Sequence, residues 1–131
     1  MGCILVGRTS FDQYKGVIYP LTNVMNIVLT SQDRQSDDES VRYVSTLDEA
    51  LEIIQELGFD RFVIAGGASV IRQCLDRQLV DKMLVSLHPY MFGEGLSITG
   101  QYTGNITLKF EDVKRQHEDF ILLEYSVRSY Y

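Results

Sequence analysis

The chain has 131 residues and a net charge of −6, and 45% of its residues are hydrophobic. This composition is typical of a soluble globular protein, and the length suffices for one core without disulfides, so we expect a single domain over residues 1–131. The acidic balance argues against a nucleic-acid partner, because binding to phosphate backbones depends on clustered Lys and Arg.

Cysteine, histidine and hydropathy patterns exclude several other classes of protein. No apolar run reaches the length of a membrane span and no basic leader precedes the first apolar residues, so a cytoplasmic location is expected. Cys3 and Cys74 lie within apolar patterns and are predicted to be buried thiols. His88 and His117 have no Cys or second His at ligand spacing, so no metal site is predicted.

In the first third of the chain, apolar runs alternate with helical and polar segments. Residues 3–6 predict a buried strand, and residues 10–14 predict a short helix. A second buried strand is expected over residues 26–30, after a connector that contains Pro20. The polar and acidic residues 31–40 are predicted to form a solvated surface loop.

The middle of the chain predicts strand, helix, strand and helix in turn. Residues 41–44 alternate like a short strand, and Thr46 with Glu49 forms the capping-box pattern that begins an amphipathic helix. The next strand is expected over residues 61–65, and a helix with a buried apolar stripe follows over residues 68–75. Crossover units of this kind build a parallel sheet.

The last third of the chain has the pattern of antiparallel strands. Residues 82–87 form an apolar run, and residues 108–114 and 120–127 alternate at period two on either side of a turn at 117–119. The expected fold is a three-layer α/β/α sandwich with a mostly parallel central sheet and a C-terminal antiparallel hairpin at a sheet edge. Such sheets bind ligands at the carboxyl ends of their parallel strands.

Two consecutive glycines, Gly66 and Gly67, lie where a predicted strand turns directly into a helix. A glycine pair leaves backbone N–H groups unobstructed, and the start of a helix adds partial positive charge. The pattern therefore predicts a cradle for an anion such as a diphosphate. A tight turn without a ligand is the alternative, which a glycine pair alone does not exclude.

Two further loops are expected at the same edge of the sheet as the glycine pair. Arg8 follows the first strand and supplies a planar cation suited to phosphate oxygens, while Thr30 and Ser31 follow the second strand and supply hydroxyl groups. Together the three loops would suit a dinucleotide. Taken singly, Arg8 is also typical of a surface arginine, and Ser31 of an ordinary turn hydroxyl.

Several segments resemble the dihydrofolate reductase superfamily in order and spacing, over nearly the whole chain. They are residues 7–11, 19–21, 26–32 and 65–68. Within the superfamily, residues 79–82 and 88–95 resemble the reductase domain of the bacterial riboflavin-biosynthesis deaminase/reductase more than they resemble folate reductases. The resemblance implies an NADPH-dependent reductase with the dihydrofolate reductase fold, acting on a small heterocycle such as 5-amino-6-(5-phosphoribosylamino)uracil.

The resemblance also implies where the coenzyme and the substrate bind. The 2′-phosphate of the adenosine is expected near Arg8 and Ser31, the diphosphate is expected over residues 67–70, and the peptide between the paired glycines is expected to be cis. The residues predicted to bind NADPH are Gly7, Arg8, Ser10, Thr30, Ser31, Gly66, Gly67, Ala68, Ser69 and Val70. Ser86 lies where family members place a hydroxyl in the substrate pocket, and a strand hydroxyl bonded to neighbouring backbone is its alternative role.

The sequence departs from the family pattern in two places. Val24 occupies the position where folate reductases usually carry an arginine for the substrate carboxylate, so folate reduction is the weaker alternative. Family members also have a central strand, a mobile loop and a helix ahead of the strand matched by residues 3–6, so the domain is expected to be short at its N-terminus. Either another chain fills this gap, the sheet closes differently, or the chain is a fragment.

These departures bear on the chemistry and the assembly. No residue at a motif-matched position supplies a proton donor, so no catalytic residue is predicted. A non-catalytic relative that binds nucleotides or serves in assembly is therefore the alternative to a reductase. The expected partners are a small-molecule substrate and a second copy in a homodimer, with neither a nucleic acid nor a membrane.

Overall fold

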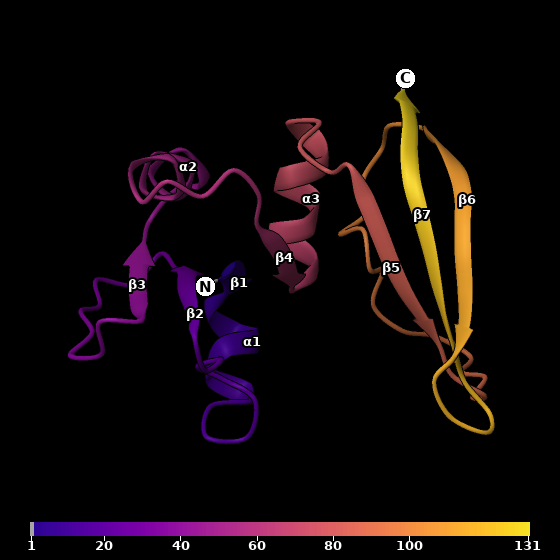
Figure 1. Cartoon of the computed structure of the whole chain (residues 1–131), viewed down its shortest axis with the longest axis horizontal. Coiled ribbons are helices and arrows are strands. Elements are labelled where there is room, and N and C mark those ends of the chain that lie inside the picture. Colours follow the sequence, from indigo (N-terminus) through magenta and orange to yellow (C-terminus); the bar gives the residue numbers. More distant parts are fainter. Residues whose placement is uncertain (1) are drawn as a thin grey trace.

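The computed structural model describes residues 2–131, whose strands form two sheets (Figure 1). In chain order, the elements are β1 (Gly2–Gly7), α1 (Arg8–Gln13), β2 (Val24–Leu29), β3 (Val41–Val44), α2 (Leu47–Glu56), β4 (Val63–Gly66), α3 (Ala68–Asp76), β5 (Lys82–Leu87), β6 (Ile106–Arg115) and β7 (Ile121–Tyr130). The expected fold class is confirmed, with parallel strands, covering helices and a C-terminal antiparallel hairpin.

The first sheet is parallel throughout, with the strand order β3-β2-β1-β4. Its central strand β1 is apolar from Cys3 to Val6, and all four of these residues are buried. Because successive side chains point to opposite faces of a strand, Cys3 and Leu5 share one core with α2 and α3, while Ile4 and Val6 share another with Phe11 of α1. Helices therefore cover both faces of this sheet.

The start of α2 follows the predicted capping pattern with one change of partner. Thr46 is the N-cap, and its hydroxyl accepts a hydrogen bond from the backbone N–H of Glu49 at 3.1 Å. The Glu49 carboxylate accepts from the backbone N–H of Ser45 at 3.0 Å rather than from that of Thr46. The cap therefore fixes the loop one residue further back than a standard capping box does.

Asn26 is a polar side chain at the centre of β2 and is fully buried. Its amide oxygen accepts from the backbone N–H of Leu21 at 2.9 Å, and its amide nitrogen donates to the backbone carbonyls of Leu21, Val24 and Ser40. Both polar atoms of this buried side chain therefore have hydrogen-bond partners. It ties β2 to the connector before it and to the loop before β3.

The second sheet is antiparallel, with the strand order β5-β7-β6. Figure 1 shows α3 between the two sheets. Met83, Ile106 and Val127 of the second sheet pack against the same core as α3. The Tyr130 hydroxyl donates to the carbonyl of Val80 at 2.8 Å and accepts from the N–H of Val80 at 3.0 Å. The end of β7 is therefore held to the segment that follows α3.

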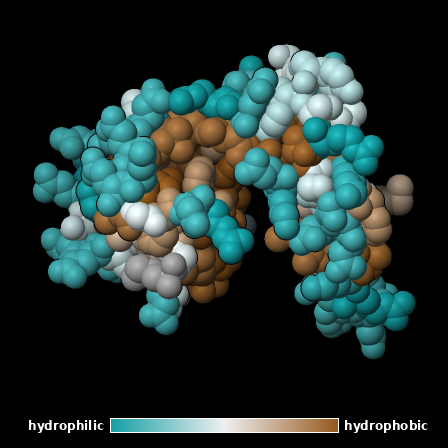
Figure 2. All heavy atoms as spheres, turned by 45° about the horizontal axis from the view of Figure 1, so that its top comes forward, coloured by the Kyte–Doolittle hydropathy of each residue, from teal (hydrophilic) through white to brown (hydrophobic). Residues whose placement is uncertain are grey.

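Between the two sheets, β4 and β5 each have an edge without a strand partner among residues 2–131. There β4 pairs with β1 alone, and β5 pairs with β7 alone. Val63 of β4 and Leu84 and Leu87 of β5 are correspondingly exposed, at 62%, 63% and 56%. Figure 2 shows a notch between the two lobes with hydrophobic residues along its sides. Residues 2–131 therefore form two separate sheets. The strands do not close up into the single sheet that was one of the expected outcomes.

Several strands begin or end at other residues than predicted, because backbone pairing with the neighbouring strand sets their ends. β4 begins at Val63 rather than at residue 61, because its register with β1 starts at Ile4 opposite Val63. The hairpin strands β6 and β7 are longer than predicted. Register shifts after Thr107 and after Phe110 break the alternation of apolar and polar residues, and the prediction had used that alternation to set the strand ends.

Candidate functional site

The carboxyl ends of β1, β2 and β4 meet at one edge of the parallel sheet, as predicted. Gly7 at the end of β1 is in register with Leu29 at the end of β2, and Val6 is in register with Gly66 at the end of β4. The loops that follow these strands therefore start at the same level. The structure brings together the three segments that the sequence predicted for the coenzyme.

The glycine-rich turn packs tightly against the end of β1. The peptide between Gly66 and Gly67 is cis, as the resemblance implies, and Gly66 has a φ of +114°. A Cβ on Gly67 would lie 3.1 Å from the Ser10 hydroxyl oxygen, and a Cβ on Gly7 would lie 3.2 Å from Cγ2 of Val70. Larger residues at these two glycines would push the segments apart, whereas a Cβ at Gly66 would meet nothing within 4 Å.

The first turn of α3 presents backbone N–H groups without a side-chain cap. Its N-cap is Gly67, which has no side chain to accept from the helix. The first turn contains Ala68, Ser69 and Val70, and the helix ladder begins with the N–H of Ile71 donating to the carbonyl of Gly67 at 3.1 Å. Amides of this kind at the start of a nine-residue helix suit an anionic ligand.

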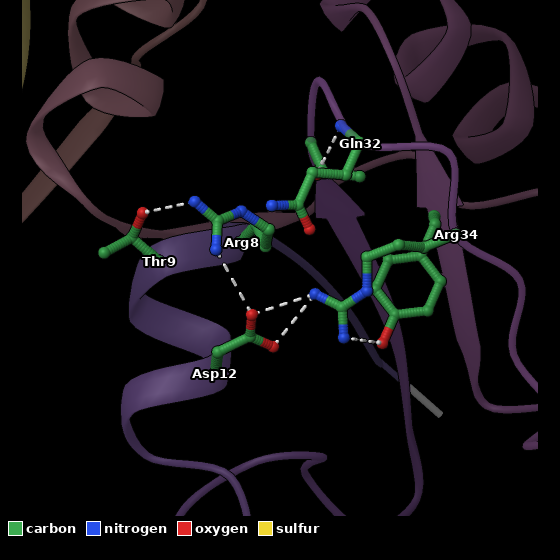
Figure 3. Close-up of polar contacts among 7 residues, drawn as sticks. Arg8, Thr9, Asp12, Gln32 and Arg34 are labelled. Atoms are coloured by element: carbon green, nitrogen blue, oxygen red, sulfur yellow. Dashed lines mark hydrogen bonds and ion pairs between the residues drawn. The ribbon is translucent and has the colours of Figure 1, made fainter.

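Thr30 and Ser31, which the sequence predicts to bind the coenzyme, lie in the loop after β2. Thr30 is buried, and its hydroxyl accepts from the backbone N–H of Gln32 at 3.0 Å, so it shapes the turn. Ser31 is exposed at the surface of the same turn. Figure 3 shows Gln32 beside the guanidinium of Arg8. The Arg8 side chain donates to the Thr9 hydroxyl at 3.5 Å and to the Asp12 carboxylate at 3.4 Å.

Two charged residues at this edge, Asp12 and Arg34, carried no assigned role in the sequence. Arg34 Nη1 donates to both carboxylate oxygens of Asp12, at 3.0 and 2.9 Å. The hydrogen bond and charge of Arg34 lower the pKa of Asp12, and Asp12 in turn raises the pKa of Arg34. In the sequence, Arg34 is a single arginine within the acidic segment 31–40. Such an arginine is typical of a solvated loop, and only the fold shows its partner Asp12.

Ser86, predicted to contact the substrate, lies apart from these residues. It belongs to β5 in the second sheet, and its hydroxyl is 2.9 Å from Nε2 of His88. The His88 ring stacks on Phe120, with ring centroids 4.5 Å apart. The glycine-rich turn follows β4 of the first sheet, and β4 is not paired with β5, so the two predicted subsites belong to different sheets in residues 2–131.

Neither of two surface hollows coincides with the predicted site. One of about 370 Å³ lies between the start of α2 and the end of α3, where Arg77 pairs with Asp48 at 2.8 Å. The other, of about 240 Å³, lies between α3 and the second sheet and includes Met83 and Tyr102 in its lining. Both hollows therefore lie away from the carboxyl ends of β1, β2 and β4.

Thiol, metal and membrane features add no second site. Burial raises the pKa of both Cys3 and Cys74 to about 11, so both thiols are protonated near neutral pH. In the part of the chain that the structure describes, no three His, Cys, Asp or Glu side chains are grouped to hold a metal ion. No helix among residues 2–131 has the length and apolar character needed to cross a membrane.

Comparison with known proteins gives a family match and distant relatives. A model of the RibD C-terminal domain family matches residues 5–122. The chain is 29% identical over 84 residues to a bifunctional dihydrofolate reductase-thymidylate synthase of Plasmodium vinckei, covering 61% of this chain and 46% of that protein. It is 22% identical over 116 residues to the uncharacterized protein YwjB of Bacillus subtilis, covering 86% of this chain and 66% of that protein. The chain thus spans less than half the length of the Plasmodium relative.

Two solved structures superpose on most of the chain. A putative riboflavin biosynthesis protein from Shewanella sp. PV-4 superposes with a TM-score of 0.80 at 17% identity, covering 97% of this chain and 74% of that chain. A pyrimidine reductase-like protein from Corynebacterium diphtheriae superposes with a TM-score of 0.75 at 16% identity, covering 97% of this chain and 76% of that chain. These similarities establish the fold.

Proposed function

Because the chain belongs to the RibD C-terminal domain family, we propose that it is an NADPH-dependent reductase of the riboflavin-biosynthesis type, acting on a small heterocyclic substrate. The family match confirms the resemblance on which the sequence expectation rested. The observation that carries the proposal is the convergence of the Gly66-Gly67 turn, the uncapped start of α3 and Arg8 at one sheet edge.

The residues present at this edge fit the adenosine diphosphate half of NADPH. The N–H groups of Ala68, Ser69 and Val70 would hold the diphosphate, because no side chain caps them and the glycines leave the approach free. Arg8 and Ser31 would hold the 2′-phosphate. When bound, NADPH supplies a hydride, and the protein's task is to position the nicotinamide against the substrate ring.

Coenzyme binding tests the first half of the proposal. We expect titration calorimetry to show tighter binding of NADPH than of NADH, and Arg8→Ala to reduce that preference by roughly tenfold or more, because charge-assisted contacts to phosphate are strong. Arg128→Ala is the matched control, since Arg128 is an exposed arginine on β7 in the other sheet. If neither coenzyme bound at millimolar concentration, the proposal would be wrong.

Turnover tests the second half of the proposal. The loss of NADPH absorbance would be followed with 5-amino-6-(5-phosphoribosylamino)uracil and, separately, with dihydrofolate. We expect oxidation with the pyrimidine and not with the folate, because Val24 stands where folate reductases carry an arginine. Oxidation with dihydrofolate alone would favour the folate reductase alternative.

A second candidate function is nucleotide binding without turnover, which one observation favours. The unpaired edges of β4 and β5 separate the coenzyme residues from Ser86, so residues 2–131 do not bring both subsites together. This candidate predicts NADPH binding without oxidation for every heterocycle tested. NADPH oxidation by the purified chain would exclude it.

We also propose that the chain forms a homodimer. Phe110 and Val113 of β6, exposed at 54% and 47%, pair with Tyr125 and Leu123 of β7 and so share one face of the second sheet, which supports an interface there. Light scattering would test this assembly. A mass equal to one chain across a concentration series would contradict it.

A further inference from the structure

Arg34 lies at the predicted coenzyme edge and is held in place by several contacts. It follows Ser31 in the loop after β2, and its side chain is 24% exposed. Nη1 donates to both carboxylate oxygens of Asp12, Nη2 donates to the Tyr43 hydroxyl at 3.2 Å, and Cζ lies 4.6 Å from the centre of the Tyr43 ring. These contacts fix the guanidinium from α1 on one side and from β3 on the other.

The Asp12 carboxylate is shared by two arginines, as Figure 3 shows. Besides its contacts with Arg34, it accepts from Arg8 Nη1 at 3.4 Å. Two guanidinium groups and one carboxylate leave one positive charge in excess, although the chain as a whole has a net charge of −6. Each guanidinium has five N–H donors, and one carboxylate satisfies only some of the ten. The remaining donors are suited to an anion with several acceptor oxygens.

The position of this cluster connects it to the coenzyme edge. Arg8 directly follows Gly7, which lies within contact distance of the glycine-rich turn. Arg34 reaches the same place from the loop after β2, so its guanidinium and that of Arg8 approach a shared carboxylate from two segments. A phosphate monoester dianion can accept from two guanidinium groups at once, which a single arginine does not offer.

We propose that Arg34 is a specificity-determining residue of this site, which binds the 2′-phosphate of NADPH together with Arg8 while Asp12 positions both guanidinium groups. This inference rests on the proposed coenzyme and deepens it. Two acidic residues of the same loop are engaged elsewhere or face solvent: Asp38 accepts from the Ser40 N–H and hydroxyl, and Asp33 is exposed.

The test compares ligands that differ by one phosphate. Calorimetry would measure NADPH against NADH, and adenosine 2′,5′-bisphosphate against adenosine 5′-monophosphate. For Arg34→Gln we expect the preference for the 2′-phosphorylated member of each pair to fall by roughly tenfold or more, while binding of the other member is unchanged. Arg34→Lys should restore part of the preference. Arg42→Gln is the matched control, because Arg42 is exposed on β3 and adjacent strand residues face opposite sides.

The outcomes separate this inference from the proposed function. A preference for NADPH that survives Arg34→Gln would overturn the inference and leave the proposed function standing. If Arg34→Gln weakened the binding of both ligands of a pair equally, the inference would also be overturned. Equal weakening is what a merely structural role of Arg34 produces. If the wild-type chain bound neither NADPH nor NADH yet selected the 2′,5′-bisphosphate through Arg34, the proposed function would fail and the phosphate site would stand. If neither the wild-type chain nor the Arg34→Gln variant bound adenosine 2′,5′-bisphosphate more tightly than adenosine 5′-monophosphate, the proposed phosphate site would be wrong.

Discussion

In the parallel sheet, Cys3 to Val6 of β1 are all buried, whereas no residue of β5, β6 or β7 is. The parallel strands lie under helices on both faces, while the antiparallel sheet meets α3 through a limited set of side chains. Buried apolar area is the main source of stability, so the first sheet dominates the folding free energy. The second sheet has exposed edges and exposed apolar side chains. Another polypeptide chain would bind there.

A pair of substitutions, one in each sheet, gives the strongest test of this difference in stability between the two sheets. Leu5 is fully buried in β1, and Leu84 is 63% exposed in β5. We expect Leu5→Ala to lower the free energy of unfolding by about 2–5 kcal/mol, because it leaves a cavity. Leu84→Ala should cost less than about 1 kcal/mol. Urea unfolding followed by circular dichroism measures both, and equal losses would contradict the comparison.

Buried hydrogen bonds provide the next test. Asn26→Leu removes a side chain that bonds three other residues, and buried groups left without partners cost about 1–3 kcal/mol each. The counterpart in the second sheet is Thr107→Val, which breaks the 2.6 Å contact between the hydroxyls of Thr107 and Ser129. That loss should be about 1 kcal/mol. A larger loss for Thr107→Val in the same unfolding assay would reverse the ranking.

The Tyr130 hydroxyl tests how the two sheets are joined. Tyr130→Phe removes both of its hydrogen bonds to Val80 and should cost about 1 kcal/mol. We expect hydrogen exchange to become faster at the amides of β5 and β7 and to stay unchanged in β1 and β2, because local opening spares the parallel sheet. Uniform acceleration across both sheets would mean that they unfold as one unit.

The smallest expected effect is at acid pH and belongs to the first sheet alone. Hydrogen bonding to Arg34 lowers the pKa of Asp12 from its usual 3.8. The folded state therefore binds this proton more weakly than the unfolded chain, so the stabilisation is complete above that usual value and disappears as pH falls through the lowered one. Asp12→Asn should lose less stability than wild type between about pH 6 and about pH 3, by only a few tenths of a kcal/mol because the pair is partly exposed. Thermal unfolding across this range measures the difference, and parallel curves would contradict it.

Local sequence patterns predicted most of the elements and part of the candidate site. The apolar run at Cys3 to Val6, the capping pattern at Thr46 and the glycine pair each specify local backbone or burial through nearby residues. The convergence of the loops after β1, β2 and β4 followed from strand direction, because parallel strands end at the same edge. These features need no knowledge of distant contacts.

Other features depend on contacts between residues far apart in the chain. Arg34 and Asp12 are separated by 22 positions, and only the packing of the loop after β2 against α1 brings them together. Whether β5 continues the parallel sheet is likewise decided by backbone pairing between distant segments, which alternation along one strand does not encode. The sequence by itself determined the strands, the helices and the glycine-rich turn before α3. The tertiary structure decided the arginine pair, the break between the sheets and the separation of Ser86, because each depends on which distant segments meet.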